Sequence, residues 1–250
     1  MRARPAWLTH LMRVLALLAL CTLALQIVFA ARIALMNVID PQSTTFQRSE
    51  AWRLLVEEHR IAWSQTWVNA DRISPHLKRA VIASEDAGFS DHGGIDWDAI
   101  EKAWERNQRA EDRIEKLKQR QPARPVVAKV VGGSTISQQL AKNLFLSGER
   151  TVLRKAQELV LTLMLEALLP KARLLEIYLN NVEWGEGLFG AQAAARHYFR
   201  VDAARLSVAQ AARLAVMLPA PKRFEKNPGS PYVLGRSATI AARMGDVELP

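Results

Sequence analysis

The longest apolar stretch of the chain lies near its N-terminus. Residues Val14 to Ala31 form an uncharged run of 18 residues, which Arg32 ends. As a helix this run would be about 27 Å long, close to the thickness of the hydrocarbon core of a bilayer. The pattern therefore predicts a transmembrane anchor over residues 14–35, with the basic residues 1–13 in the cytoplasm. A cleaved signal peptide is the alternative, but the run is long for one and no clear A-x-A cleavage site follows it.

Beyond residue 40 the apolar residues recur at helical spacing, and the alternation typical of a strand does not extend over any length. Ser74 followed by Pro75 can begin one helix, and Asp96, Thr151 and Ser207 can cap three others. The pattern predicts an all-α protein whose helices form a single domain.

The distribution of charge divides this part of the chain. Residues 41–73 form a connecting segment, and residues 74–245 hold the predicted domain. Within the domain, residues 105–129 are rich in charge and glutamine and nearly free of large apolar side chains. We interpret them as a solvated helix and a mobile linker, following a helix that ends at about Trp104. Residues 159–169 are apolar on nearly all sides, which predicts a buried central helix.

Composition narrows the classes of function. The 34 Lys and Arg residues exceed the 25 Asp and Glu residues, so the formal net charge is +9. This balance favours a negatively charged partner or substrate, and nucleic acid, anionic lipid and pyrophosphate all fit. The single cysteine, Cys21, lies in the apolar run, which excludes a disulfide framework and a cysteine-based metal site.

Two adjacent carboxylates, Glu85 and Asp86, precede an aromatic residue, His92 and a glycine turn. The helix that begins after Ser74 would carry Glu85 at its C-terminal end, where the helix dipole disfavours an ionised carboxylate. Such a group can act as a base at neutral pH. An ordinary acidic turn with solvated charges explains these residues equally well.

Residues 132–145 are the most informative stretch of the chain. Two glycines precede Ser134, which we predict to cap the next helix, leaving backbone amides free for an anionic oxygen. One face of this helix carries Thr135, Gln138, Gln139 and Lys142. Hydroxyl, amide and ammonium groups suit a sugar or a phosphate, whereas a solvated helix face more often mixes Glu with Lys. We therefore favour a ligand-binding face.

A cationic cluster follows at Arg150, Arg154 and Lys155, with Glu158 one helical turn after Arg154. Glu158 can form a helix salt bridge, which contributes little to stability if it is exposed. It can equally be a second functional carboxylate held beside cations. The sequence leaves both explanations open.

Two separated glutamates with a basic, amide-rich helix between them favour chemistry at a sugar carbon linked to phosphate. Paired carboxylates are the usual groups in glycosyl chemistry. Lysine and arginine stabilise a diphosphate leaving group, because negative charge builds up on it as the bond breaks. A simple hydrolase needs the acid and the base but not the cationic cluster.

From about Ser74 to Met244 the chain resembles the peptidoglycan glycosyltransferases of glycosyltransferase family 51, and most closely the monofunctional ones. The motifs that carry the resemblance are Glu85-Asp86-x-x-Phe89-x-x-His92-x-Gly94, Gly133-Ser134-Thr135-Ile136-x-Gln138-Gln139-Leu140-x-Lys142-Asn143, Arg154-Lys155-x-x-Glu158, and Leu175-Glu176-x-Tyr178-Leu179-Asn180 with Gly185-x-Gly187-x-x-Gly190. They occur in the order of the family. One departure is the length of residues 105–129, which exceeds that of the usual segment between the first and second motifs.

The resemblance implies a lysozyme-like helical fold with a membrane-proximal jaw, and polymerisation of lipid II into glycan strands. It implies that Glu85 is the base for the acceptor 4-hydroxyl and that Glu158 assists at the donor diphosphate. The implied substrate-binding residues are Asp86, His92, Ser134, Thr135, Gln138, Gln139, Lys142, Arg150, Arg154 and Lys155. Similar enzymes often use a divalent cation, Mg²⁺ or Mn²⁺, which the sequence itself does not require, and we assign no protein metal ligands. No organic cofactor is expected.

The implied partners are lipid II, the lipid-linked glycan chain, the membrane, and proteins of cell division or elongation, but no nucleic acid. The implied location is the bacterial inner membrane, crossed once, with the catalytic domain in the periplasm. The transpeptidase signatures Ser-x-x-Lys and Lys-Thr-Gly are missing, so we expect glycan polymerisation without cross-linking. The alternatives are a lysozyme-like muramidase or lytic transglycosylase, and a membrane-anchored scaffold that performs no chemistry.

Overall fold

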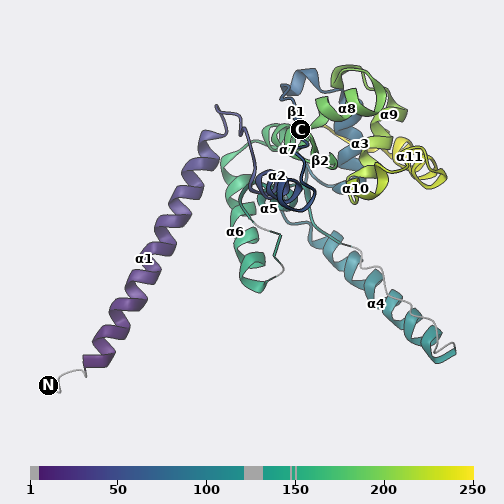
Figure 1. Cartoon of the computed structure of the whole chain (residues 1–250). Helices are drawn as coiled ribbons and strands as arrows, with labels where there is room; N and C mark the ends of the chain where they lie inside the picture. The colour runs from purple at the N-terminus through teal and green to yellow at the C-terminus, as the bar shows by residue number, and fades with distance from the viewer. Residues whose placement is uncertain (1–5, 121–131, 147, 150) are drawn as a thin grey trace.

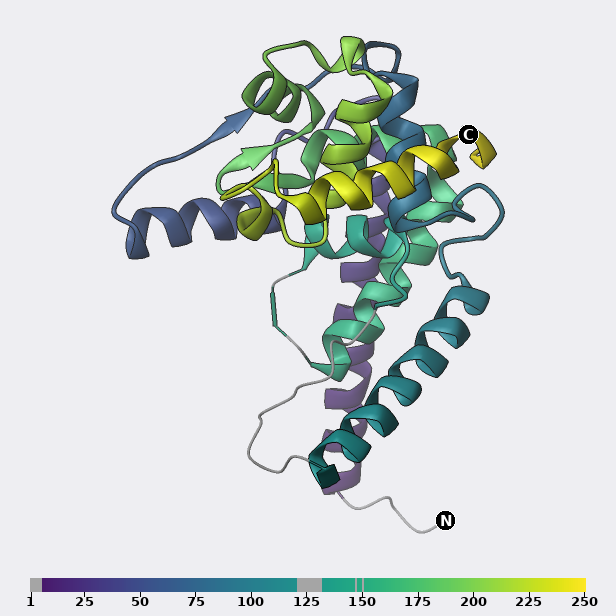
Figure 2. The ribbon, with the colours of Figure 1, turned by 90° about the vertical axis from the view of Figure 1, so that its right-hand side faces the viewer.

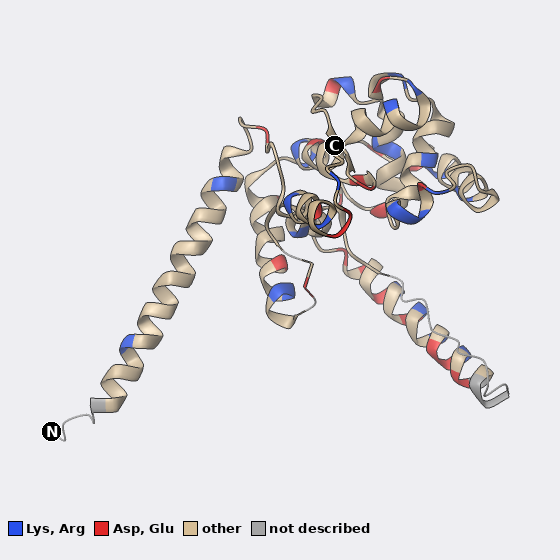
Figure 3. Cartoon of the chain, in the orientation of Figure 1, with Lys and Arg blue, Asp and Glu red and all other residues tan. Residues whose placement is uncertain are grey.

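A long N-terminal helix leads into a domain built of shorter helices (Figure 1). The computed structural model describes residues 6–120, 132–146, 148–149 and 151–250. In these ranges one helix is long and apolar enough to cross a membrane, α1 (Ala6–Leu35), and its most apolar window is not buried against the rest of the chain. No charged residue lies between Arg13 and Arg32, and α1 is uniformly tan between its two blue bands in Figure 3.

Helices dominate the described chain, and the all-α prediction is confirmed. The remaining helices are α2 (Thr45–Glu57), α3 (Pro75–Glu85), α4 (Trp97–Arg120), α5 (Ile136–Phe145), α6 (Val152–Leu168), α7 (Lys171–Asn181), α8 (Ala191–Phe199), α9 (Val208–Met217), α10 (Pro221–Phe224) and α11 (Pro231–Arg243). Short 3-10 turns lie at Ala70–Arg72, Ala203–Arg205 and Met244–Asp246.

A small sheet, which the sequence pattern did not predict, joins distant parts of the chain. Its strands are β1 (Ser64–Gln65), β2 (Glu183–Gly185) and β3 (Leu188–Phe189). β3 lies between the other two, parallel to β1 and antiparallel to β2. Strands of two or three residues are too short to show an alternating pattern, and β2 and β3 are buried throughout.

The turn between β2 and β3 requires a glycine. Gly187 has a φ of +69°, and a Cβ atom there would lie 2.3 Å from the carbonyl oxygen of Ala62. The carbonyl oxygen of Gly187 accepts a hydrogen bond of 2.8 Å from the backbone amide of Ser64. This close backbone approach fixes the segment that leads into β1 against the sheet.

Helix α9 packs against α3 and α11 and forms the part of the core that holds α3 in place (Figure 2). Its buried side chains include Ala211 and Leu214, and those of α3 include Leu77 and Val81. The side chain of Ser74 caps α3, as predicted, and the helix ends at Glu85. The packing of α3 therefore determines where Glu85 lies.

Helices α2, α5, α6 and α1 pack in a series, each against the next. The α5 helix contacts α2 and α6, and α6 in turn contacts α1. The side-chain amides of Gln26 and Gln157 exchange hydrogen bonds of 3.0 and 3.1 Å, and the rings of Phe29 and Phe145 meet edge to face. Ile33 of α1 is fully buried. The C-terminal part of α1 is thus packed onto the domain.

Three predictions about local structure are wrong. The cap of α5 is Thr135 and not Ser134, because the Thr135 hydroxyl accepts from the backbone amide of Gln138 while the Gln138 side chain accepts from that of Thr135. The helix at Trp97 does not end near Trp104 but continues through Arg120. The N-terminal part of residues 105–129 is therefore helical as predicted, while the rest, from residue 121, lies outside the described residues.

The third wrong prediction concerns α6, which is not buried on all sides. Leu161 and Leu165 are in the core, but Leu163 is about half exposed, and Leu153 in the first turn is 83% exposed. The reason is that α6 makes its main contacts with α5, α1 and α7, so that among the described residues its remaining side is largely left to solvent.

Candidate active site

Glu85 lies at the end of α3, in a cleft of about 530 Å³ formed by α3, α4, α11 and the segment before α5. Burial raises the pKa of Glu85, and the nearby Asp86 carboxylate adds to the rise, while hydrogen bonds from Gln139 and Ser84 oppose it. The predicted direction is therefore correct, although burial rather than the helix dipole is the main cause. A half-buried carboxylate with a raised pKa can accept a proton near neutral pH.

The Glu85 carboxylate is held by a chain of hydrogen bonds. The Nε2 amide of Gln139 donates to Oε2 of Glu85 over 3.0 Å, and the Tyr178 hydroxyl donates to Oε1 of the same Gln139 over 3.0 Å. Tyr178 is only 1% exposed, and burial raises its pKa well above 10, so its hydroxyl keeps its proton. Tyr178 thus orients the Gln139 amide so that its donor faces Glu85.

Replacing Tyr178 with phenylalanine should move the acid limb of the pH profile of kcat/KM to higher pH. Without the hydroxyl, the Gln139 amide is no longer oriented, and its donation to the ionised Glu85 weakens. The pKa of Glu85 then rises further, so a base that must be ionised becomes active at a higher pH. On the acid side we expect about a fivefold loss of kcat/KM, equivalent to one hydrogen bond of about 1 kcal/mol.

The matched control is Tyr198→Phe. The Tyr198 hydroxyl donates to the carbonyl oxygen of Trp184 over 2.8 Å and has no contact with Glu85. Its loss should leave the acid limb in place. An unshifted acid limb in Tyr178→Phe, measured as kcat/KM between pH 5 and 9 (roughly the range in which such groups titrate), would contradict the orienting role.

Asp86 connects the two halves of the site. It is buried, and its Oδ2 accepts a hydrogen bond of 2.9 Å from the backbone amide of Ile136, the first residue of α5. Its Oδ1 lies 2.8 Å from Nε2 of His92. Burial raises the pKa of Asp86, and the contacts with His92 and Ile136 oppose the rise. Asp86 and His92 therefore hold the N-terminus of α5 beside Glu85.

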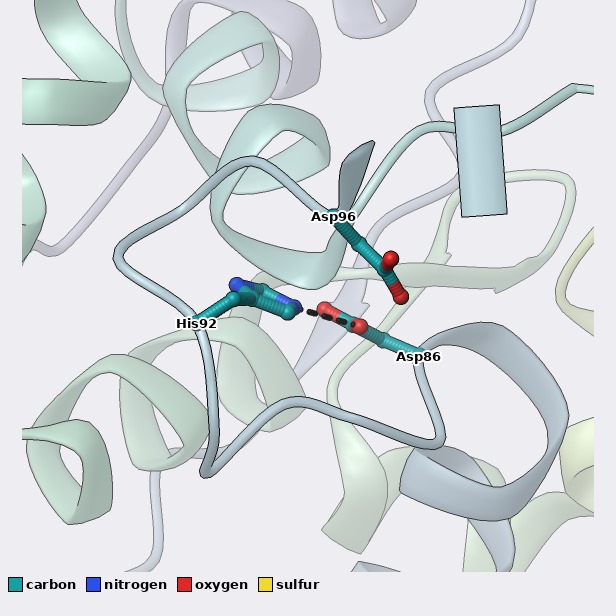
Figure 4. Close-up of side chains that lie close together, drawn as sticks. All are labelled: Asp86, His92 and Asp96. Atoms are coloured by element: carbon teal, nitrogen blue, oxygen red, sulfur yellow. Dashed lines mark hydrogen bonds and ion pairs between the residues drawn. The ribbon is translucent and has the colours of Figure 1, made fainter. Parts of the chain in front are cut away.

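Asp86, His92 and Asp96 are close enough to be considered as metal ligands (Figure 4), since their ligand atoms lie within 4.8 Å of one another. Nδ1 of His92 accepts a hydrogen bond from the amide of Gly94, so Nε2 carries the proton and donates it to Asp86. A protonated nitrogen has no lone pair for a metal. One oxygen of Asp96 also caps α4 by accepting from the amide of Ala99. In this arrangement the group does not fit a divalent cation.

The face predicted on α5 is divided in the structure. Thr135 and Gln138 are buried and cap the helix, and the Thr135 hydroxyl also donates to the carbonyl oxygen of Gly94. Gln139 points to Glu85, as described above. Lys142, one turn further along, reaches a second cavity of about 310 Å³ that Arg154 also lines. The two ends of one helix therefore serve two different parts of the site.

The cationic cluster surrounds Glu158, which is 3% exposed. Its two carboxylate oxygens accept from Nη1 of Arg154 over 2.7 Å and from Nζ of Lys155. The Nε–H group of Arg154 is buried and has no hydrogen-bond partner among the residues that the structure describes. Because a buried donor without a partner is costly, Arg154 is suited to an anionic ligand that supplies the missing acceptor.

The Lys142 ammonium completes this cluster. Partial burial lowers its pKa, and the charges of Arg154 and Lys155 lower it further, whereas the Glu158 carboxylate opposes the decrease. The charge of Glu158 thus acts to keep Lys142 protonated among other cations.

A third cavity of about 300 Å³ lies between the other two along α5. It shares Gly133 and Ser134 with the Glu85 cleft and is lined by Gln138 and Lys155 on the other side. The structure therefore brings the predicted residues together along one side of the domain.

Of the predicted site residues, Arg150 lies outside the described residues. Tyr178 lies in one of the sequence motifs, but its separation of 39 residues from Gln139 gives no sequence signal that the two side chains are in contact.

A half-buried carboxylate in one cavity, and cations around a buried glutamate beside another, fit the class of enzymes that transfer sugars from phosphorylated donors. Comparison with known proteins agrees with this class. Residues 55–245 match the family described as Transglycosylase. The chain is 49% identical to the biosynthetic peptidoglycan transglycosylase of Paraburkholderia xenovorans over 248 residues, 99% of this chain and 97% of that protein.

A second relative is the biosynthetic peptidoglycan transglycosylase of Burkholderia thailandensis, which is 53% identical over 228 residues, 91% of this chain and 83% of that protein. The chain therefore belongs to the transglycosylase family. The resemblance found in the sequence motifs is confirmed, as are the lysozyme-like helical fold and the assignment as a glycosyltransferase.

Proposed function

We propose that the protein is a peptidoglycan glycosyltransferase that polymerises lipid II into β-1,4 glycan strands and releases undecaprenyl diphosphate. The observation that carries the proposal is the position of α5 between two carboxylates: Gln139 donates to Glu85, and Lys142 lies in the electrostatic field of Glu158. The family match and the names of the relatives support the same reaction.

In the proposed mechanism Glu85 acts as the general base. Its carboxylate takes the proton of the acceptor 4-hydroxyl as the oxygen attacks C1 of the lipid-linked sugar. The new C–O bond forms on the face opposite the diphosphate, so the α linkage becomes a β linkage. The proton on Glu85 then passes to water. The raised pKa of Glu85 supports this role, because a base works best when its pKa lies close to the pH of the medium.

The leaving diphosphate gains negative charge as its bond to C1 breaks. Lys142, Arg154 and Lys155 would stabilise this charge, with the free Nε–H of Arg154 as one donor. Glu158 does not face the reacting sugar in this mechanism but fixes two of the cations through its ion pairs. The Asp86, His92 and Asp96 group does not fit a divalent cation in this arrangement, and the steps described here use only side chains of the protein.

The apolar helix α1 supports a membrane location. We propose that it crosses the bacterial inner membrane once, with the basic residues 1–13 in the cytoplasm and the catalytic domain in the periplasm. This orientation would place the site on the side where lipid II is polymerised. The proposed protein partners are those of cell elongation or division on the same side.

Incubating the purified full-length protein with lipid II tests the proposal. We expect glycan chains whose length grows with time, together with free undecaprenyl diphosphate. Incubation with purified sacculi forms the second arm, in which a muramidase or a lytic transglycosylase would release muropeptides. Muropeptide release without glycan synthesis would replace the proposed function with glycan cleavage, and neither activity would favour a scaffold.

A further inference from the structure

The cleft around Glu85 is also lined by cations that no motif includes. Helix α4 contributes Lys102 and Arg106, and helix α11 contributes Arg236 and Arg243. All four side chains are exposed to solvent. Helices that are far apart in the sequence therefore bring positive charge to the cavity that holds the proposed base.

Helix α11 carries its two cations on one face. Arg236 and Arg243 are seven residues apart on α11, which places them on one face about 10 Å from each other. The neighbouring face of α11 is fixed in the core by Val233 and Ile240, each three residues before one of the arginines, and the helix packs against α9 and α3. Arg236 and Arg243 are thus attached to the same rigid unit that positions Glu85.

The four cations lack counter-ions within the described part of the chain. None forms an ion pair or a hydrogen bond with another described residue. The acidic residues of the same cleft have other contacts: Gln139 donates to Glu85, His92 and Ile136 engage Asp86, and Asp96 caps α4. Unpaired cations in one cavity suit a ligand that carries negative charge.

We propose that Lys102, Arg106, Arg236 and Arg243 form a binding subsite for an anionic group of the acceptor substrate. The inference rests on the proposed function, because the acceptor 4-hydroxyl must reach Glu85 inside this cleft. The cavity that holds Lys142 and Arg154 shares no lining residue with the cleft, so the two sets of cations serve different substrates. Lipid II offers two kinds of anion to the subsite, the carboxylates of its peptide and its own diphosphate.

The test uses the full-length Arg236→Gln/Arg243→Gln double variant. The donor carries a blocked terminal 4-hydroxyl and is held at saturation, so that only added lipid II acts as acceptor. We expect the acceptor KM to rise by about tenfold, which corresponds to the loss of a charge-assisted contact, with kcat within about twofold of the parent. The KM of the variant should also depend less on salt than that of the parent.

The matched control is Arg72→Gln, since Arg72 is an exposed arginine that lies outside the cleft. It should leave the acceptor KM unchanged. A double variant with the KM of the parent overturns the subsite while glycan synthesis by the parent still supports the proposed function. A parent protein that makes no glycan overturns the proposed function instead.

A second arm identifies the anion. Lipid II with amidated peptide carboxylates should bind the parent about tenfold more weakly if the carboxylates are the ligand, and the double variant should no longer distinguish the two substrates. If the diphosphate is the ligand, amidation should leave both KM values unchanged and the double variant should still show its increase. A Lys102→Gln/Arg106→Gln variant repeats the test on α4, and an unchanged KM there would remove α4 from the subsite.

Discussion

Replacing Glu85 with glutamine is expected to lower kcat for glycan synthesis by about 10³-fold, within the range that a general base contributes. Glutamine keeps the size of the side chain and can still accept from Gln139, so the fold and the KM should change little. What it cannot do is take the proton of the acceptor hydroxyl. The measurement is the rate of glycan formation at saturating lipid II, together with a thermal melt that checks folding.

Asp91→Asn provides the comparison for this variant. Asp91 is an exposed carboxylate in the loop that follows α3, and it lies near Glu85 in the sequence without lining its cleft. Its neutralisation should leave kcat near that of the parent. Glutamine at position 85 with more than about a tenth of the parent kcat would rule out Glu85 as the base.

Replacing Glu158 with glutamine should reduce both stability and activity. Removing one partner of a buried ion pair leaves Arg154 and Lys155 without a counter-ion, which should lower the free energy of unfolding by about 3 kcal/mol. The value lies at the lower end of the usual range because Lys155 is 55% exposed and can turn to solvent. With the cations displaced, kcat should fall by about 10²-fold.

The pH profile separates an electrostatic role of Glu158 from a purely structural one. The Glu158 carboxylate raises the pKa of Lys142, against the lowering effect of burial and of neighbouring cations. In the glutamine variant the pKa of Lys142 falls further, so the ammonium loses its proton at a lower pH. The alkaline limb of kcat/KM should therefore move to lower pH. The control is Glu115→Gln, on the exposed side of α4, in which we expect the alkaline limb to stay in place. If the limb also stays in place in Glu158→Gln, the role of Glu158 is only structural.

Local features of the fold follow from short-range chemistry and were predictable. Ser74 caps α3 and Thr151 caps α6, because a hydroxyl before a helix accepts from an amide two or three residues later. Ser207 caps α9 as predicted, and it forms a capping box with Gln210. The position of Glu85 at a helix end is a consequence of the same start signal at Ser74. At the adjacent hydroxyls Ser134 and Thr135, the signal that identifies Thr135 as the cap is Gln138, which stands three residues after it at the spacing of a capping box.

Contacts between distant residues were not predictable from periodicity. Asp86 binds the backbone amide of Ile136, which is 50 residues away, and this contact depends on how α3 and α5 pack. The exposure of Leu153 and Leu163 on α6 depends equally on which helices happen to cover it. Periodicity shows which face of a helix is apolar, but not whether another helix covers that face.

The packing of α1 onto α6 affects the position of the domain relative to the membrane. Ile33 is buried, and Gln26 and Gln157 are paired, so the last turns of the anchor are part of the folded core. With α1 in a bilayer, the depth of α6 relative to the lipid is set by this side-by-side contact and not by the length of the loop after α1. Inserting residues into that loop would leave the height of the catalytic domain unchanged, whereas exchanging α1 for a plain polyleucine helix would keep the protein in the membrane but release the domain to tilt.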